Sequence, residues 1–592
     1  MVALAVLNEP TIDDATMIPD LLARHPQART VLDHYGLRGC GGRLGPDESL
    51  GFFAATHGVE IDLLLSDLRE ALHHVDRHVA SNKTKPEDSI YRRFFLGAIA
   101  TVLTAGASWG AIILWQIGFQ GKFTGIPVQH VNAHGQAQIY GWCALFIMGF
   151  AYQAFPRMWQ AQLVRPKLAG ATFILMLAGL TLRTIGMIGS GSWAIPVALV
   201  GGAAQIAAVT IFAAQIFLTF QRSSARVEPY IGFILIALLW FFAMTVLDQW
   251  HTYRTMSATS RDALVAQIAT WQAPLRDLQI HGLLMFTIFG VSMRMLPPLF
   301  GVPSVNPRRA WRALILLTLA VTTEVMIFLI YRLTMNHAVA ALLMIPWITL
   351  TIGAWMVAAP FKLWRKPSVA DRSVKFVRAA YAWLAISLVM LLLLPVHQAL
   401  SHIPFSHAYY GSIRHAITVG FASLMIMGMA AKVVPTLNGV DPRRLPSLWL
   451  PFALVNLGCF LRVSLQALTD FYPQMFSIVG ISGVFEVAGL TIWGVGLARI
   501  MLKRPTETLQ TRASKRDTIA ANDIVGDVLA TFPRTLDAFT EFGFAPLRNP
   551  FLRKTLARTV TIHQAARMHG VDVDELLVAL NQRKLDALPA ID

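Results

Sequence analysis

The sequence predicts an all-α fold: a polytopic membrane bundle of twelve transmembrane helices in a pseudo-threefold arrangement, with two small duplicated helical cytoplasmic domains. Three observations predict it. Hydrophobic residues make up 55% of the 592 residues and charged residues only 14%, far from the usual balance of soluble proteins. Apolar stretches recur through the middle of the chain, each near the roughly 20 residues that a helix needs to cross a bilayer. The two ends of the chain resemble each other.

The apolar stretches define the transmembrane domain. They lack the alternation of barrel strands, and open sheet edges cannot exist in lipid, so we predict helices. The domains are expected at 1–80 (helical), 93–502 (transmembrane) and 517–592 (helical), with linkers at 81–92 and 503–516. The twelve helices are expected at residues 94–119, 135–155, 168–189, 193–219, 229–248, 280–301, 312–331, 338–359, 377–397, 412–436, 448–469 and 474–500.

Loop charges predict the orientation. The loops on one side carry 14 Lys and Arg in 59 residues, whereas those on the other side carry 5 in 73. Because positive loops stay inside, we expect both termini in the cytoplasm of a bacterium, with the bundle in its inner membrane. The Lys and Arg residues that keep these loops in the cytoplasm also account for the net charge of +16. We therefore expect membrane lipid, and no nucleic acid, as a partner. The first 90 residues show no signal peptide, which leaves the first helix as the insertion signal.

Nine histidines lie at or near the predicted periplasmic ends of helices, and none lies at a predicted cytoplasmic end. A single such histidine can equally be an interfacial side chain bonded to water or backbone. As a set, they predict a metal or haem site, because imidazole is a frequent ligand of both. The set consists of His130, His134, His251, His281, His337, His397, His402, His407 and His415.

Three of these histidines begin a repeated pattern. His134, His281 and His415 each open a helix that continues through small residues and Met and ends in Pro, and the three helices are four apart. Close packing and helix termination alone would explain the glycines and prolines, but not the histidines. A four-helix repeat predicts a pseudo-threefold bundle in which equivalent helices face a common interior.

This pattern resembles a known architecture. Twelve helices with ligating histidines on helices 2, 6 and 10 look like the catalytic subunits of haem–copper oxidases and nitric oxide reductases. More specifically, AHGQAQIYGWCALFIMGFAYQAFPRMW and RHAITVGFASLMIMGMAAKVVPTLNG are similar to the NnrS family. The resemblance covers about residues 90–505. It implies haem b, with copper or non-haem iron as a second metal, and nitric oxide as the small partner molecule.

The resemblance also suggests roles for the residues. His134, His281 and His415, with His130 and His407, are expected to bind the cofactor, and His251, His337, His397 and His402 are expected to complete metal sites. Helix 6 has QIHGLL and no adjacent His pair occurs near helix 7, so a standard oxygen-reducing centre is not expected. The chain has no haem-attachment or cysteine-rich motif, so an external electron donor is needed.

Two acids lie within the predicted helices. Glu324 lies near the histidine layer and is our catalytic candidate, either as a proton relay or as a metal ligand, and Glu486 lies in mid-helix 12. Alternatively, each acid satisfies a structural charge. The candidate partners of these two acids are the basic residues Arg183, Arg294, Lys432 and Arg462.

The two ends are copies of one another. Residues 11–37 align with 518–544 at an offset of 507, and 57–68 align with 569–580 at an offset of 512. They resemble small helical domains of iron–sulfur-repair and hybrid-cluster-associated proteins, in which a cysteine pair follows the shared turn. Only Cys40 is present here. It is a candidate thiol sensor or bridge to another chain, and docking without redox chemistry is an equal alternative.

Three functional hypotheses follow. The leading one is a haem-containing membrane protein of nitric oxide metabolism or nitrosative-stress defence, with an enzyme similar to nitric oxide reductases favoured. The alternative is a non-enzymatic haem sensor that signals through the duplicated domains. A transporter with a midplane site is disfavoured, because the histidines lie near one surface and paired charges in mid-membrane are scarce.

Overall fold

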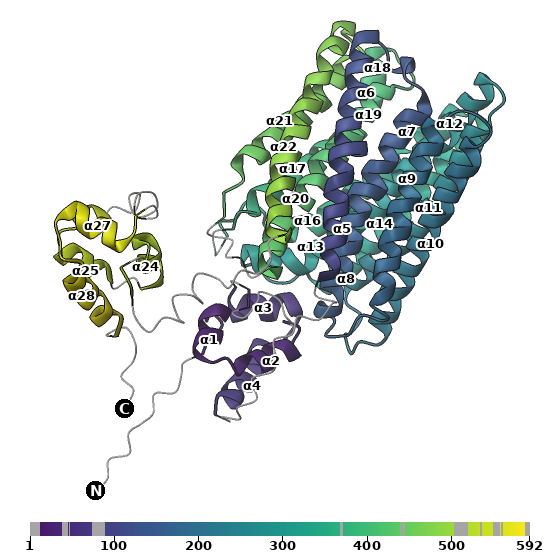
Figure 1. The fold of residues 1–592 in the computed structure, drawn as a ribbon. Helices are drawn as coiled ribbons and strands as arrows, with labels where there is room; N and C mark the ends of the chain where they lie inside the picture. The colour runs from purple at the N-terminus through teal and green to yellow at the C-terminus, as the bar shows by residue number, and fades with distance from the viewer. Residues whose placement is uncertain are drawn as a thin grey trace. The chain divides into compact units, whose positions relative to one another are not determined.

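The computed structural model consists of helices and their connections (Figure 1). It describes residues 12–37, 45–46, 48–73, 89–367, 371–438, 440, 445–502, 519–521, 523–532, 535–548, 557 and 560–585. Within them the only β contacts are two isolated bridges, Met17–Ser49 and Ile524–Thr561. The chain divides into two compact units, Met1–Leu502 and Lys503–Asp592. The predicted linker 503–516 and Cys40 lie outside the described residues.

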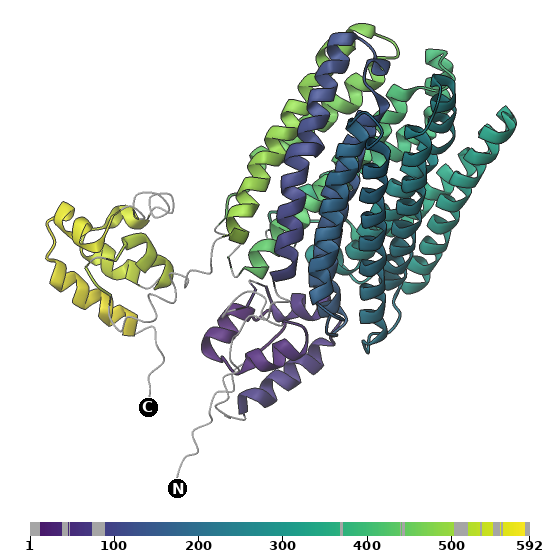
Figure 2. The same ribbon diagram turned by 45° about the vertical axis from the view of Figure 1, so that its right-hand side comes forward.

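Twelve helices in the described residues are long and apolar enough to cross a membrane, which confirms the predicted number. They are numbered here as spans 1 to 12, and Figure 2 shows them side by side in one bundle. In chain order they are Ile90–Gln120, Val128–Met158, Lys167–Ile188, Ala194–Gln221, Pro229–Met256, Arg261–Phe300, Pro307–Thr334, His337–Phe361, Val374–Leu392, His407–Leu437, Trp449–Leu468 and Pro473–Leu502.

Several predicted boundaries are wrong because helices continue beyond their apolar stretches. Span 2 begins at Val128 rather than 135, so His130 and His134 lie inside it. Span 5 runs on to Met256 and includes His251. Span 6 is a helix of 40 residues from Arg261 to Phe300, so His281 lies near its middle rather than at its start. Polar residues in these extensions lower the hydropathy without ending the helix.

Span 6 forms a long helical hairpin with span 5. Its first part, α12 (Arg261–Asp277), is preceded by Ser260, whose side chain accepts a hydrogen bond from the backbone N–H of Ala263, as N-cap residues do. α12 packs against α11 (Pro229–Met256). The ring centroids of Trp250 and Trp271 lie 4.5 Å apart across this hairpin.

The repeat predicted from the sequence is also present in the packing of individual side chains. In each repeat one helix carries two glycines eight residues apart and a proline seven residues after the second. The second glycine faces a phenylalanine of the preceding span, and an added methyl group would lie 2.6, 3.1 or 2.8 Å from its Cβ in repeats 1, 2 and 3. The glycines and prolines are Gly141, Gly149 and Pro156; Gly282, Gly290 and Pro297; and Gly420, Gly428 and Pro435, and the phenylalanines are Phe94, Phe233 and Phe376.

The first glycine of each pair has an equivalent neighbour as well. Gly141, Gly282 and Gly420 face a side chain seven residues after the phenylalanine, which is Thr101 in the first repeat and Trp240 and Trp383 in the others. Six close contacts at matching positions are therefore shared by three helix pairs. The bundle is built from three copies of one four-helix unit, as the sequence predicted.

The two terminal modules have matching helices. The N-terminal module contains α1 (Ile18–Arg24), α2 (Ala28–His34), α3 (Leu50–His57) and α4 (Ile61–His73). The C-terminal module contains α24 (Val525–Thr531), α25 (Thr535–Glu541), α27 (Ile562–His569) and α28 (Val573–Leu585). When the helices of the two modules are paired in order, their first and last residue numbers differ by 507 in the first two pairs and by 512 in the last two. The sequence duplication is thus a duplication of structure, with a separate apolar core in each module.

Candidate functional site

The predicted histidines lie beside unusual turns of the backbone. In the described residues, π-helical segments occur in spans 1, 2, 6 and 10. η5 (Ala137–Ala144) begins three residues after His134, η6 (Leu278–Leu284) contains His281, and η8 (Ala416–Ser423) directly follows His415. Such wide turns are rare and concentrate at functional sites. All three repeats therefore place a histidine at or next to a π-helical segment.

His134 and His415 are held in the same way. His134 Nδ1 lies 3.1 Å from the carbonyl oxygen of Gly106, and His415 Nδ1 lies 2.7 Å from that of Gly411. A carbonyl oxygen only accepts, so each Nδ1 carries the hydrogen and each Nε2 keeps its lone pair. The His134 ring also packs against Gly110, where an added methyl group would lie 2.5 Å from its Cε1 atom.

The two imidazoles lie close enough to each other to interact electrostatically. Arg462 of α21 (Trp449–Leu468) acts on both rings. His134 belongs to span 2 and His415 to span 10, so the fold brings together residues that are 281 positions apart. Their Nε2 atoms are the ones available for a ligand.

Several buried N–H groups beside these histidines have no acceptor among the described residues. They are Nε and Nη1 of Arg462 and Nε of Arg414. Buried donors are nearly always satisfied, and an unsatisfied one costs about 1–3 kcal/mol. Glu486 is near enough to Arg462 to interact electrostatically, yet its Oε1 also lacks a donor there. The residues thus fit a ligand that brings both a metal for Nε2 and carboxylates for the arginines, as haem does.

His281 and Glu324 form a second buried group. His281 Nδ1 lies 2.9 Å from Glu324 Oε2, and Trp347 Nε1 donates to Glu324 Oε1 at 2.8 Å. The carboxylate of Asp277 joins them, and ligand atoms of all three residues lie within 4.8 Å of one another. The sequence placed His281 and Glu324 at similar depths but missed Asp277 and Trp347. Asp277 lies four residues before His281, and that spacing was the available signal.

The remaining predicted ligands have separate surroundings. His397 Nε2 lies 2.8 Å from Asp470 Oδ2, and its ring stacks on Tyr409 with centroids 4.0 Å apart. His251 is buried, and its Nε2 has no partner in the described residues. Among those residues, no group of three or more possible metal ligands includes any of the predicted metal ligands His251, His337, His397 and His402. The other positions are His130, which lies edge-on to Trp109, and His337, His402 and His407, which are exposed.

The buried basic side chains have other partners than Glu324. Arg183 Nη2 lies 3.5 Å from Asp248 Oδ2, and Arg294 Nη1 lies 3.6 Å from Glu228 Oε2. Lys432 Nζ lies 2.7 Å from Asp371 Oδ2. Glu324 is instead held by His281 and Trp347, and it takes part in none of these three pairs with Arg or Lys.

Comparison with known protein families identifies the bundle. The model of the NnrS protein family matches residues 90–504, from the first residue of span 1 to two residues beyond span 12. The chain belongs to the NnrS family. A second model, described as a domain of unknown function (DUF1858), matches residues 519–577 in the C-terminal module. No curated protein matches the chain.

In this NnrS protein the N-terminal module packs against one end of the repeated helices. Gln153, Arg294 and Lys432 occupy the same place in the three repeats, three residues before the proline. Arg294 Nε donates to the carbonyl oxygen of Thr56 at 2.9 Å, and Lys432 Nζ lies 4.5 Å from the ring centroid of Phe52. Helix α3, which carries Phe52 and Thr56, therefore contacts two of the three repeats through equivalent positions.

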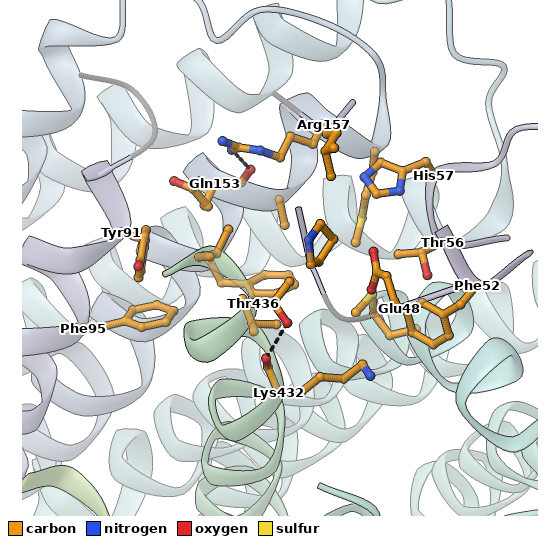
Figure 3. A pocket seen from close by; sticks show the side chains of 18 residues that line it. Glu48, Phe52, Thr56, His57, Tyr91, Phe95, Gln153, Arg157, Lys432 and Thr436 are labelled. Atoms are coloured by element: carbon orange, nitrogen blue, oxygen red, sulfur yellow. Dashed lines mark hydrogen bonds between the residues drawn. The ribbon is translucent and has the colours of Figure 1, made fainter. Parts of the chain in front are cut away.

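A cavity of about 100 Å³ lies at this junction. Figure 3 shows Phe52, Thr56 and His57 at one side of it and Gln153, Tyr91 and Phe95 at the other. The lining is mostly apolar, with the charged ends of Arg157 and Lys432 nearby. The junction is thus an ordered contact between the module and the NnrS bundle.

Acid is expected to weaken this junction through His57. Burial, with smaller contributions from Arg294 and Arg157, lowers the pKa of His57 from 6.5 to about 4, although its Nδ1 bonds to the Phe53 carbonyl. Between pH 6.5 and 4 a released, exposed His57 binds more protons than the docked one, so docking weakens as pH falls. We expect a roughly tenfold or larger loss of docking between pH 7 and 5.

Protease cleavage of the N-terminal module at both pH values measures this loss. His57→Gln is the control, because it keeps a polar side chain that does not titrate. A wild-type pH response that persists in His57→Gln would contradict the assignment to His57.

Proposed function

We propose that this NnrS protein is a haem-containing membrane enzyme of nitric oxide metabolism, in which His134 and His415 hold haem b. One observation carries the proposal: two histidines from different repeats, each with Nδ1 bonded to a carbonyl oxygen, lie beside buried arginine N–H groups that have no acceptor among the described residues. Haem iron takes imidazole nitrogen as an axial ligand. Bound haem would supply one-electron chemistry and a binding position for a small gas molecule.

Residues of the chain would orient the haem ligands and balance the charge of the cofactor. The carbonyl oxygens of Gly106 and Gly411 fix the tautomer and orientation of the rings, as hydrogen-bond partners of ligating histidines do. Arg462 and Arg414 would balance the carboxylates of the cofactor. Burial of the site in the bundle would exclude bulk water, which raises the strength of these interactions.

Glu324 is proposed as the residue that holds a proton near the reaction. Both of its oxygens are bonded, one by His281 Nδ1 and the other by Trp347 Nε1. A proton can therefore pass between His281 and Glu324 over one hydrogen bond. Reduction of nitric oxide consumes protons and electrons, and we propose that an external donor supplies the electrons.

A sensor remains the second candidate, and one observation favours it. α3 contacts spans 6 and 10, which also carry His281 and His415. A change in the position of these helices on gas binding would be transmitted to the N-terminal module, which we propose to be cytoplasmic. In this alternative nitric oxide is bound without turnover.

Nitric oxide consumption by the purified protein separates the two candidates. With ascorbate and a redox mediator as donor, an enzyme is expected to consume nitric oxide above the protein-free rate, as recorded by a nitric oxide electrode. Glu324→Gln is expected to lower this rate while the haem spectrum persists, whereas Asp470→Asn, in a separate His–Asp pair, serves as the control. A haem spectrum that shifts with nitric oxide but shows no consumption would establish the sensor. A colourless protein would refute both.

A further inference from the structure

The geometry points to a divalent metal site formed by Asp277, His281 and Glu324, suited to manganese or iron rather than copper. This site is separate from the histidine pair proposed to hold haem and requires no haem. It differs from the expected metal sites, because Asp277 was not predicted at all, His281 was expected to bind the cofactor, and Glu324 was predicted as either a proton relay or a metal ligand.

The first argument is distance. The metal-ligand atoms of the three side chains lie within 4.8 Å of one another, and His281 Nδ1 and Glu324 Oε2 are 2.9 Å apart. Two ligands that bind one metal at about 2.1 Å and at right angles lie about 3.0 Å from each other. A metal would therefore replace the hydrogen bond between these atoms with little movement of either side chain, and in the metal-bound protein Glu324 would act as a metal ligand instead of passing a proton to His281.

The second argument is charge. His281 and Glu324 are only 6% and 4% exposed, and Asp277 is partly buried. Arg414 is a permanently positive group that acts on both Asp277 and His281. Two carboxylates facing one guanidinium leave an excess negative charge when His281 is neutral, and buried charge without a partner is costly. A divalent cation would remove that excess.

The third argument is rigidity. Trp347 fixes the second oxygen of Glu324, so the carboxylate cannot rotate freely. Asp277 ends α12 and His281 lies in η6, with the first three residues of the π-helical segment between them. Next to His281, Gly282 packs on Trp240, where an added methyl group would lie 3.0 Å from Cγ. The ligands are thus held in place before any metal arrives, which lowers the cost of binding.

The ligand set selects the metal. Two carboxylates and one imidazole are harder ligands than the thiolates and thioethers that select Cu(I), and they suit Mn²⁺ or Fe²⁺. Three protein ligands leave further octahedral positions for water or a small exogenous ligand. Copper, which the family resemblance implies, would have to bind elsewhere.

Mn²⁺ titration of metal-depleted protein, followed by electron paramagnetic resonance, tests the inference. We expect one Mn²⁺ per chain and at least a tenfold weaker affinity in Asp277→Asn, and a similar loss in Glu324→Gln, since even indirect partners of a metal cost 10- to 100-fold. Asp470→Asn is the matched control, because Asp470 also bonds to a histidine at 2.8 Å but belongs to no three-residue ligand group in the described part of the chain. The Asp277→Asn protein is checked for folding by its thermal unfolding profile and haem absorbance.

The outcomes separate this inference from the proposed haem function. Equal Mn²⁺ affinity in Asp277→Asn and Asp470→Asn would overturn the metal site, and Cu⁺ displacing Mn²⁺ at equal concentration would overturn its preference for manganese or iron. Haem absorbance without a Mn²⁺ site would refute the metal site alone. A Mn²⁺ site in a protein that binds no haem would refute the haem proposal alone.

Discussion

Replacement of His134 or His415 by Ala is expected to remove most of the Soret absorbance per mole of purified protein. Each variant deletes one Nε2 ligand, while the Nδ1 anchor of the other histidine stays intact. Absorbance of the reduced and oxidised protein, together with extracted haem, measures the effect. Added imidazole is expected to restore part of the absorbance, because it can occupy the space that the missing ring leaves.

His397→Ala is the control for these variants. His397 is also buried and hydrogen-bonded, but its Nε2 is already bonded to Asp470. We expect it to retain wild-type haem content. If His134→Ala and His415→Ala kept the full spectrum, haem binding by this pair would be refuted.

Asp248→Ala is expected to destabilise the bundle by about 3–5 kcal/mol, the usual cost of leaving one partner of a buried ion pair alone. Arg183 is fully buried, and its guanidinium bonds to the backbone oxygen of Asp248 and the side chain of Gln205. Removal of the carboxylate leaves the positive charge without its counter-ion inside the membrane domain. Thermal unfolding in detergent measures the loss.

A double variant tests whether the charge is the cause. Asp248→Ala with Arg183→Met removes both charges and keeps an apolar side chain of similar length, so most of the lost stability should return. Arg254→Ala, at the end of the same helix, serves as a control for a change of charge alone. If the stability losses caused by the two substitutions instead added together in the double variant, packing and not the unpaired charge would explain the effect.

The sequence predicted the large features because they depend on local patterns. Apolar length gave the number of spans, and two constant offsets gave the duplicated modules. The three-part repeat was visible in His134, His281 and His415. Its paired glycines and their phenylalanine contacts could also have been found by aligning the three prolines.

The sequence could not predict features that depend on the route of the chain in space. The meeting of His134 with His415 requires spans 2 and 10 to be neighbours. Asp277 was missed because it precedes the apolar stretch that marked helix 6, although the helix itself extends through it. π-helical turns have no simple residue signature, so the local geometry of the histidines emerged only with the fold.

The length of span 6 has a consequence for the supply of electrons. A helix of 40 residues is about 60 Å long, twice the roughly 30 Å thickness of the hydrocarbon layer. We therefore expect its polar first part, which pairs with span 5, to project into water beyond Trp250 and Trp271, residues typical of the lipid headgroup level. Asp277, at the end of that part, lies near the depth at which the hairpin enters the lipid. This projection would let the external electron donor that we propose approach the protein without entering the membrane.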